Sequence, residues 1–382
     1  MRRLGAARAA GDFEARRAAC LRYPRAVDQE LTRRLAALPP HARARADRMF
    51  DIRVVSGETD PPAALSAWLE RAFGSVEAVR RQTIVKVTNL ATLEGTLFAP
   101  LRARRPVDGQ AQGNDLAAEI AATTGDPFCT PESATPAATY GRIRGTRIVT
   151  GANAALADAH HAVLVFDTHD PLAFDAELIA DLFATGRAWV DRARETDPDA
   201  ANYLLAWNCL WRAGGSIIHG HAQALLGAGP HYARLERFRR DVEAYRGVGG
   251  DLVADLVAVH SDLGLALPLT DGVTVLAHLT PAKEHELLVI GPPGMDERQP
   301  AFTDGVTRAL LAYRDRLGVR SFNLAMWRPP LDARPGWGAV PPIVRLVDRG
   351  DPYARPSDIG AMELYGTPIV GSDPYQLIAA VL

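Results

Sequence analysis

The chain has 382 residues, enough for two ordinary domains, and 47% of them are hydrophobic, which is typical of a globular protein and excludes disorder throughout. The 43 Lys and Arg are offset by 45 Asp and Glu, so the net charge of -2 provides no basic field for a nucleic acid. Three scattered cysteines exclude a disulfide framework, and no run approaches the ~18 apolar residues that span a bilayer, so we expect a cytoplasmic protein that is neither secreted nor membrane-spanning.

Residues 1–81 are predicted to form a helical N-terminal extension. Ala, Leu, Arg and Glu dominate this stretch, and its breaks fall at Pro39-Pro40 and Pro61-Pro62. From residue 82 onward, short β-branched runs alternate with Gly, Pro and Asn. We therefore predict a domain boundary near residue 81, and we find no motif that carries chemistry before it.

The predicted elements after the extension repeat one order, β-β-α-β-β. The first set consists of strands near 142–149 and 161–166, a helix near 175–195, and strands near 202–208 and 216–225. After a helical stretch near 230–261, the second set consists of strands at 273–279 and 286–290, a helix at 302–317, and strands at 321–327 and 342–347. This order predicts an α+β fold of two tandem halves, 82–246 and 247–382, each an antiparallel sheet that carries one helix.

A run of chemistry-bearing side chains extends from Asn208 to Gln223 and reads N-C-L-W-R-A-G-G-S-I-I-H-G-H-A-Q. If a strand covers its end, His219, His221 and Gln223 point to the same face, because side chains on a strand alternate. Two imidazoles and an amide are costly to bury without partners, which favours a ligand, a metal or an active site over a pair of structural histidines. The two glycines before Ser216 let backbone N–H groups approach a phosphate, and Ser216 adds a hydroxyl donor.

This segment resembles the active-site motif of the galactose-1-phosphate uridylyltransferases, a family of the histidine-triad (HIT) superfamily. In that family two HIT-like halves are fused, and the second His of H-x-H-x-Q attacks the α-phosphorus of a nucleotide sugar to form a nucleotidyl-histidine. The resemblance assigns this role to His221, and neutral imidazole is a good nucleophile at pH 7 when a backbone carbonyl fixes its other nitrogen. Gln223 can donate a hydrogen bond to a phosphoryl oxygen but cannot act as a general acid, which suits phosphate leaving groups and acceptors.

The same resemblance assigns nucleotide contacts outside the motif. Arg102 and Arg105, within R-A-R-R-P, match two family arginines that contact the nucleotide phosphates, and guanidinium groups bind phosphate oxygens bidentately. Asn208 matches a residue that holds a phosphate, and Asn153 matches one that reads the base. The ordinary alternatives are a solvated loop for the arginines and a turn for Asn153. The pair His160-His161 has no role in the resemblance.

Asp126-Pro-Phe-Cys129 is similar to the family's C-P-F-C-P metal knuckle, with Asp126 in place of the first Cys. His169, in the loop after a predicted strand, and His219, the first His of H-x-H, match the family's other two ligands. Asp, Cys and His all bind zinc, and four protein ligands make a closed site, so the resemblance implies a structural zinc. The alternative is that Asp126 caps a turn, Cys129 is a small buried side chain and no metal binds.

The specific motifs of the family match only in the first half. Where the family often has a further H-x-H on a strand, this chain has Ile343-Val344-Arg345, and where the family has a metal-ligating His after a Trp, it has Trp327-Arg328. We therefore expect no second metal, and a degenerate second half on the acceptor side. Glu363, in D-I-G-A-M-E-L, resembles a residue that holds the sugar by accepting a hydrogen bond from a hydroxyl.

Three functions follow from these residues. The first is a nucleotidyltransferase, similar to the hexose-1-phosphate uridylyltransferases, that works by double displacement through His221 on a nucleotide sugar and a sugar 1-phosphate. The second is a phosphorylase of nucleotide sugars or dinucleoside polyphosphates, which uses the same nucleophile with inorganic phosphate as the acceptor. The third is a non-catalytic nucleotide-binding module, which would explain the altered second half. A homodimer is compatible with the resemblance.

Overall fold

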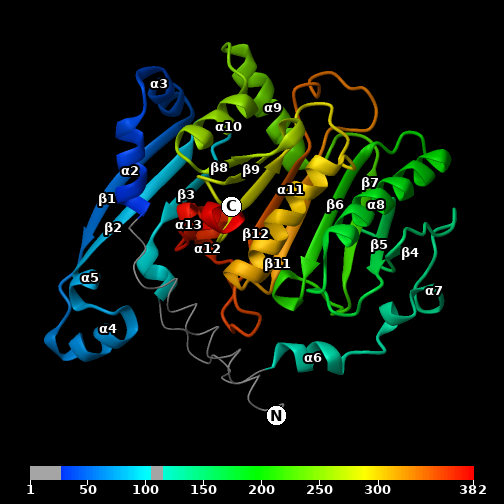
Figure 1. Ribbon diagram of the computed structural model, residues 1–382, viewed down its shortest axis with the longest axis horizontal. Helices are drawn as coiled ribbons and strands as arrows, with labels where there is room; N and C mark the ends of the chain where they lie inside the picture. The colour runs from blue at the N-terminus through cyan, green and yellow to red at the C-terminus, as the bar shows by residue number, and fades with distance from the viewer. Residues whose placement is uncertain (1–26, 105–114) are drawn as a thin grey trace.

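The structure is a computed structural model that describes residues 27–104 and 115–382. Its strands form a four-stranded sheet and a nine-stranded sheet (Figure 1). Arg105, one of the predicted phosphate contacts, lies outside the described residues. Within the described ranges, no helix is long and apolar enough to cross a lipid bilayer.

The nine-stranded sheet joins the two predicted halves edge to edge. The first half contributes β4 (Ile148–Ala152), β5 (His160–Phe166), β6 (Asn202–Cys209) and β7 (His221–Gly227). The second half contributes β8 (Ala266–Pro268), β9 (Thr274–Ala277), β10 (Leu287–Ile290), β11 (Phe322–Trp327) and β12 (Ile343–Asp348). The strand order is β4-β5-β7-β6-β11-β12-β10-β9-β8, so both halves have the same internal order and meet where β6 pairs antiparallel with β11. The predicted α+β duplication is confirmed.

Two long helices, α8 (Ala176–Thr196) and α11 (Pro300–Leu311), cover one face of this sheet (Figure 1). Asp175 caps α8 by accepting a hydrogen bond from the Leu178 N–H group, and apolar residues then recur along the helix at three- and four-residue spacing. That apolar stripe packs into the main core with Ala162 and Leu164 of β5. The side chains on the opposite face of the sheet are therefore not covered by α8 and α11.

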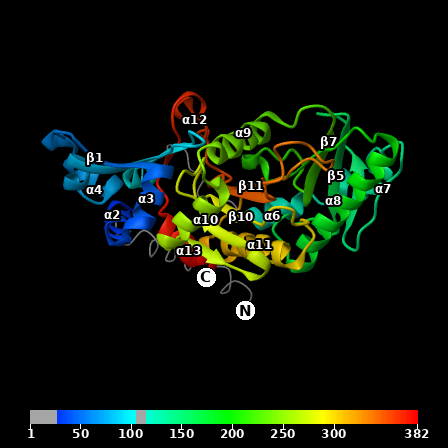
Figure 2. The same cartoon turned by 90° about the horizontal axis from the view of Figure 1, so that it is seen from above.

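The four-stranded sheet lies outside the duplicated part. It is formed by β1 (Phe50–Glu58), β2 (Arg81–Asn89), β3 (Gly95–Phe98) and β13 (Ile369–Val370). The helices around it are α2 (Val27–Ala37), α3 (Pro40–Met49), α4 (Ser66–Phe73) and α5 (Val76–Arg80). Figure 2 shows β1 and α4 extending to one side of the molecule.

The helical prediction for residues 1–81 is wrong at β1. Ile52 and Val54 alternate with Asp51 and Arg53, and this period-two pattern favours a strand over the helix suggested by the surrounding composition. β1 pairs with β2 along its whole length, from Phe50 to Glu58. The two sides of the boundary predicted near residue 81 therefore share one sheet.

The remaining elements connect these sheets. The helices are α6 (Leu116–Ala122), α7 (Pro131–Ala134), α9 (Ala233–Gly247), α10 (Leu252–Asp262), α12 (Ala361–Tyr365) and α13 (Pro374–Val381). The short 3-10 turns are η1 (Ala63–Leu65), η2 (Pro100–Arg104), η3 (Pro127–Cys129), η4 (Trp211–Ala213) and η5 (Thr270–Gly272), and a π-helical turn, η6 (Ala312–Leu317), continues α11. Three of these turns, η2, η3 and η4, carry or precede residues predicted to be functional.

Candidate active site

His221 and Gln223 lie on β7, on the sheet face that α8 does not cover. Ala222 and Ala224 pack into the main core, so the alternation of the strand turns His221 and Gln223 to the other side. The ring of Phe128, from η3, meets the His221 ring edge-on with 4.9 Å between centroids. The two predicted catalytic side chains therefore share one face, with an aromatic wall beside them.

A tight turn precedes β7 and separates the two histidines of the motif. β7 begins at His221, later than predicted, so His219 precedes the strand instead of sharing its face. A Cβ at Gly220 would lie 2.8 Å from Cδ2 of Phe166 and 3.0 Å from the carbonyl oxygen of Thr168, so only glycine fits. The side chain of His219 is thereby directed to a different group of neighbours.

The ring of His221 is held through one nitrogen. Its Nδ1 lies 2.8 Å from the carbonyl oxygen of His219. In the neutral ring Nδ1 carries the proton and donates it to this carbonyl, which leaves the lone pair on Nε2. Burial lowers the pKa of His221, and the hydrogen bond to the His219 carbonyl opposes this only in part. The ring is therefore neutral at pH 7, and its Nε2 is unprotonated.

Gln223 contacts a histidine that sequence reasoning missed. Val163 of β5 pairs with Gln223, and His161 lies two residues along β5 on the same face. Nε2 of His161 is 3.0 Å from Oε1 of Gln223 and 3.3 Å from Nδ2 of Asn153, which follows β4. His161 thus lies between Gln223 and the residue predicted to read the base. The alternation of β5 is the signal that could have identified it.

Asn208 is held by side chains of the second half. It lies on β6 opposite Asn323 of β11, and Nδ2 of Asn323 donates to Oδ1 of Asn208 at 2.7 Å. Arg349 donates to Oδ1 of Asn323 at 2.6 Å and forms a bidentate pair with Asp358 at 2.6 and 2.8 Å. Because the oxygen of Asn208 is engaged, its NH2 group remains as the donor that a phosphate requires.

The loop that carries Ser216 runs close to β6. A Cβ at Gly215 would lie 2.8 Å from the carbonyl oxygen of Asn208, so this close approach requires glycine. Trp211 of η4 anchors the start of the loop, because its Nε1–H donates to the Pro352 carbonyl at 2.7 Å. Ser216 itself is exposed and accessible to a ligand.

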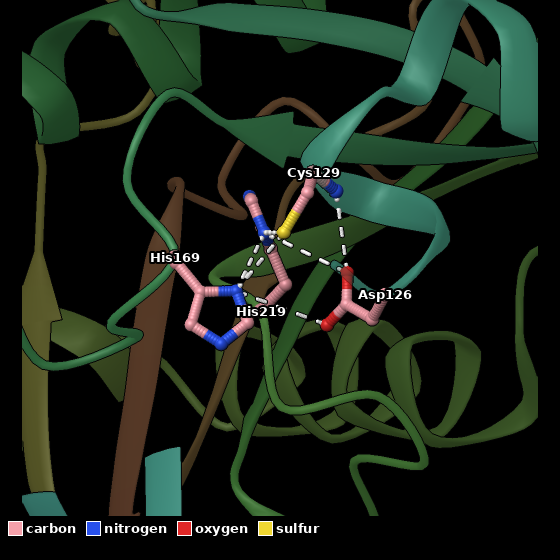
Figure 3. Close-up of side chains that lie close together, drawn as sticks. All are labelled: Asp126, Cys129, His169 and His219. Atoms are coloured by element: carbon pink, nitrogen blue, oxygen red, sulfur yellow. Dashed lines mark hydrogen bonds and ion pairs between the residues drawn. The ribbon is translucent and has the colours of Figure 1, made fainter. Parts of the chain in front are cut away.

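The four predicted metal ligands lie together (Figure 3). Nδ1 of His169 is 3.1 Å from Nδ1 of His219, and Sγ of Cys129 is 3.3 Å and 3.5 Å from these two nitrogens. The carboxylate oxygens of Asp126 approach the same nitrogens at 3.9 and 3.8 Å. One ligand atom from each residue lies within 4.8 Å of the others.

The chemistry of this donor set fits a cation. Nε2 of His169 lies 2.9 Å from the Ile120 carbonyl oxygen, and Nε2 of His219 lies 2.9 Å from that of Phe166. Both Nε2 atoms therefore carry protons, and the lone pairs of the two Nδ1 atoms face each other, which is unfavourable unless a cation lies between them. Oδ2 of Asp126 is buried without a hydrogen-bond partner. The separations resemble the edges of about 3.3 to 3.8 Å of a tetrahedral zinc site.

Two further predicted residues are held in other contacts. Arg102 is exposed on η2, which is fixed elsewhere because the Arg104 side chain donates to the Phe73 carbonyl and the Ala99 N–H donates to Val370 of β13. Within one chain, Arg102 therefore does not surround His221, contrary to the prediction. Glu363 accepts a hydrogen bond from the Gly360 N–H at 2.8 Å and caps α12. Its contact with a sugar stays a prediction.

Comparison with solved structures identifies the fold. The structure is similar to an ADP-glucose phosphorylase from Arabidopsis thaliana with bound ADP-glucose, at 15% identity and a TM-score of 0.60, over 78% of this chain and 97% of that protein. A galt-like protein from Arabidopsis thaliana has 14% identity and a TM-score of 0.55, over 68% of this chain and 91% of that protein. A uridylyltransferase has 16% identity and a TM-score of 0.52, over 78% of this chain and 97% of that protein. No protein-family model and no curated protein matches the sequence.

Identities this low establish a shared fold and no more. The fold is the one shared by these phosphorylase, galt-like and uridylyltransferase structures, as the sequence resemblance implied. Activity, substrate and acceptor must be argued from the side chains of this chain.

Proposed function

We propose that this chain is a nucleotidyltransferase in which Nε2 of His221 is the nucleophile. The observation that carries the proposal is the 2.8 Å contact between Nδ1 of His221 and the His219 carbonyl oxygen, together with the burial of the ring. These features keep the imidazole neutral and direct its proton away from the reacting nitrogen. A structural histidine pair does not require a glycine-bounded turn that leaves Nε2 unprotonated.

The reaction would proceed in two displacements at one phosphorus atom. Nε2 of His221 attacks the α-phosphorus of a nucleotide sugar, the N–P bond forms, and the P–O bond to the sugar 1-phosphate breaks. The Nδ1 proton stays in its hydrogen bond to the His219 carbonyl, which supports the positive charge on the ring of the nucleotidyl-histidine. A phosphate oxygen of the acceptor then attacks, and the N–P bond breaks.

Gln223 restricts the acceptor to a group that needs no general acid. Its amide can stabilise a nonbridging phosphoryl oxygen but has no proton to give to an alkoxide. A phosphate, with a second pKa of about 6, is largely deprotonated at pH 7 and needs little proton transfer. A sugar 1-phosphate would make the protein a transferase and inorganic phosphate would make it a phosphorylase. Proteins named for both activities share the fold.

The nucleotide contacts proposed with this mechanism differ in their support. Asn208 is supported by the engaged oxygen of its amide, and Asn153 by its place beside His161. Arg102 would bind the nucleotide phosphates from a second copy of the chain or after η2 moves, and the same phosphate contact is proposed for Arg105. The mass of the native protein with and without nucleotide tests whether a homodimer supplies them.

We propose zinc as the cation of the donor set formed by Asp126, Cys129, His169 and His219. Four protein ligands leave no open position, so the metal's chemistry is to crosslink η3, the loop after β5 and the turn before β7. Because His219 also supplies the carbonyl that holds His221, this crosslink would position the nucleophile without touching the reacting atoms.

The test is intact-protein mass spectrometry after incubation with a panel of nucleotide sugars. We expect a covalent adduct of one nucleoside monophosphate in the wild type and none in His221→Gly, and the adduct mass identifies the base. Product analysis with sugar 1-phosphate or inorganic phosphate then separates transfer from phosphorolysis. No adduct with any member of the panel would reject the covalent mechanism and favour the non-catalytic nucleotide-binding module.

A further inference from the structure

We propose that His161 is a positioning residue that fixes the amide of Gln223 so that its NH2 group faces the reacting phosphate. The inference rests on the proposed function for its consequence in catalysis, but the geometry behind it is independent of any substrate. His161 is buried, and the family resemblance gives it no part.

A backbone N–H, which can only donate, defines which nitrogen of His161 carries its proton, and it outweighs the longer contact of 3.3 Å between Nδ2 of Asn153 and Nε2 of His161. The backbone N–H of Ala157 donates to Nδ1 of His161 at 3.1 Å, so Nδ1 holds the lone pair. In the neutral ring the proton is then on Nε2, which lies 3.0 Å from Oε1 of Gln223. Nε2–H donates to this oxygen, because an imidazole N–H cannot donate to the NH2 group of the amide.

The strand register shows where the other end of the amide points. Gln223 lies opposite Val163, while His221 lies opposite Val165. His161 is displaced along β5 in the direction away from His221. The amide oxygen turned toward His161 therefore leaves the NH2 group on the His221 side of Gln223, where a phosphoryl group attached to Nε2 would lie.

An amide without this contact has two orientations related by a half-turn. In the wrong orientation its oxygen would face the nonbridging oxygens of the phosphate, and the interaction would change from attraction to repulsion. By occupying Oε1, His161 removes that orientation before substrate binds. This is the preorganisation that makes a hydrogen-bond donor effective in a transition state.

The first experiment measures the single-turnover rate of adduct formation in matched variants. We expect His161→Phe, which keeps the ring volume and removes the donor, to slow the reaction by on the order of 10²-fold, as loss of a transition-state donor does. His161→Gln retains an N–H donor and is expected to recover at least tenfold of that loss. His160→Phe is the control, because His160 points to the other face of β5 and pairs with Asp197, and it is expected to react at the wild-type rate.

A double-mutant cycle separates positioning from general destabilisation. If His161 acts only through the amide, His161→Phe adds no further loss in a Gln223→Ala background. The proposal would be overturned if the loss of rate in the double variant equalled the product of the two single losses. A wild-type rate for a folded His161→Phe protein would also overturn it. Equal losses in His161→Gln and His161→Phe would also count against it.

A second readout does not depend on activity. The side-chain NH2 resonances of Gln223 are assigned by their disappearance in Gln223→Ala, and we expect them to shift in His161→Phe and to stay in place in His160→Phe. Unchanged resonances in His161→Phe reject the contact. If the wild type forms no adduct but the resonances shift, the proposed function fails and the positioning of the amide stands.

Discussion

His219 links the metal-ligand cluster, formed by Asp126, Cys129, His169 and His219, to the ring of His221. It does so through its side chain on one side and its backbone carbonyl on the other. Its Nδ1 faces the metal-ligand cluster, and its backbone carbonyl accepts the Nδ1 proton of His221. Burial lowers the pKa of His219, which keeps Nδ1 available to a metal. The position of the His221 ring is therefore coupled to the metal-ligand cluster through His219.

Replacing Gln223 by Ala tests whether His221 forms the covalent bond while Gln223 only stabilises phosphoryl charge. The variant is expected to form the adduct, because His221 keeps its own hydrogen bond, but more slowly by on the order of 10²-fold, because one donor to the developing phosphoryl charge is lost. Single-turnover mass spectrometry measures the rate. A variant that forms no adduct at all would indicate that Gln223 does more than stabilise charge.

Elemental analysis of protein purified without chelator tests the metal centre. We expect zinc in the wild type and its loss in Cys129→Ser, with a lower melting temperature, since a structural metal contributes its binding free energy to folding. Cys209→Ala is the control, because Cys209 is buried in the main core away from the cluster and should keep the metal. Wild-type protein free of metal would reject the site.

At the scale of elements, the junction of β6 and β11 brings the second half into the active site. Asn323 accepts a hydrogen bond from Arg349, which follows β12, and donates one to Asn208, so two side chains of the second half fix this amide. Asn323→Asp keeps a partner for Arg349 but removes the donor to Asn208. We expect about tenfold weaker binding of the nucleoside monophosphate, measured by calorimetry, because one net hydrogen bond is lost. Unchanged affinity would show that Asn208 does not contact the nucleotide.

In the second half, the sheet position that corresponds to Gln223 holds Arg345, which belongs to a buried ion cluster. Gln223 pairs with Ala206, Ala206 with Ala325, and Ala325 with Arg345, so Gln223 and Arg345 stand in one row across the junction. Arg345 binds the buried Glu286 at 2.7 Å and also pairs with Glu94. A charged side chain engaged in this way is unsuited to act as a second nucleophile.

Arg345→Met is expected to destabilise the fold by about 3 to 5 kcal/mol, because it removes the guanidinium that pairs with the buried Glu286. Burial alone would raise the pKa of Glu286, but Arg345 and His278 lower it to about 2. The stabilisation is therefore present above the ordinary pKa of about 4.5 and is lost as the pH falls toward 2. Denaturant titrations from pH 7 to pH 3 should show a flatter pH dependence in the variant, while Glu94→Gln, at a partly exposed site, should change stability little.

Sequence patterns were sufficient where function depends on neighbours in the chain. The H-x-H-x-Q spacing predicted one shared face for His219, His221 and Gln223, which holds for His221 and Gln223 but not for His219, because β7 begins only at His221. The four clustered ligands come from three segments distant in the chain, and only the motif resemblance grouped them. Sequence reasoning missed His161 and Asn323, because their contacts arise only when strands distant in the chain pair. It also placed Arg102 in the wrong neighbourhood, because the packing of η2 against the four-stranded sheet is a tertiary feature.

At the scale of the whole molecule, the two halves of the nine-stranded sheet have the same strand order but carry different functional side chains. The first half supplies the candidate nucleophile and metal ligands, and the second supplies Asn323 and Arg349, which orient Asn208. The four-stranded sheet is fastened to the second half, where the Thr96 hydroxyl donates to the Pro281 carbonyl at 2.7 Å and Glu94 pairs with Arg345. This arrangement predicts that the halves function only as one unit.

Isotope exchange between a labelled sugar 1-phosphate and its nucleotide sugar, without a second acceptor, tests the covalent mechanism most directly. This half-reaction is common to a transferase and a phosphorylase, because both release the sugar 1-phosphate when the nucleotidyl-histidine forms. We expect exchange in the wild type and none in His221→Gly, which should still bind nucleotide through Asn208. Exchange at the wild-type rate in His221→Gly would contradict the assignment of His221 as the nucleophile.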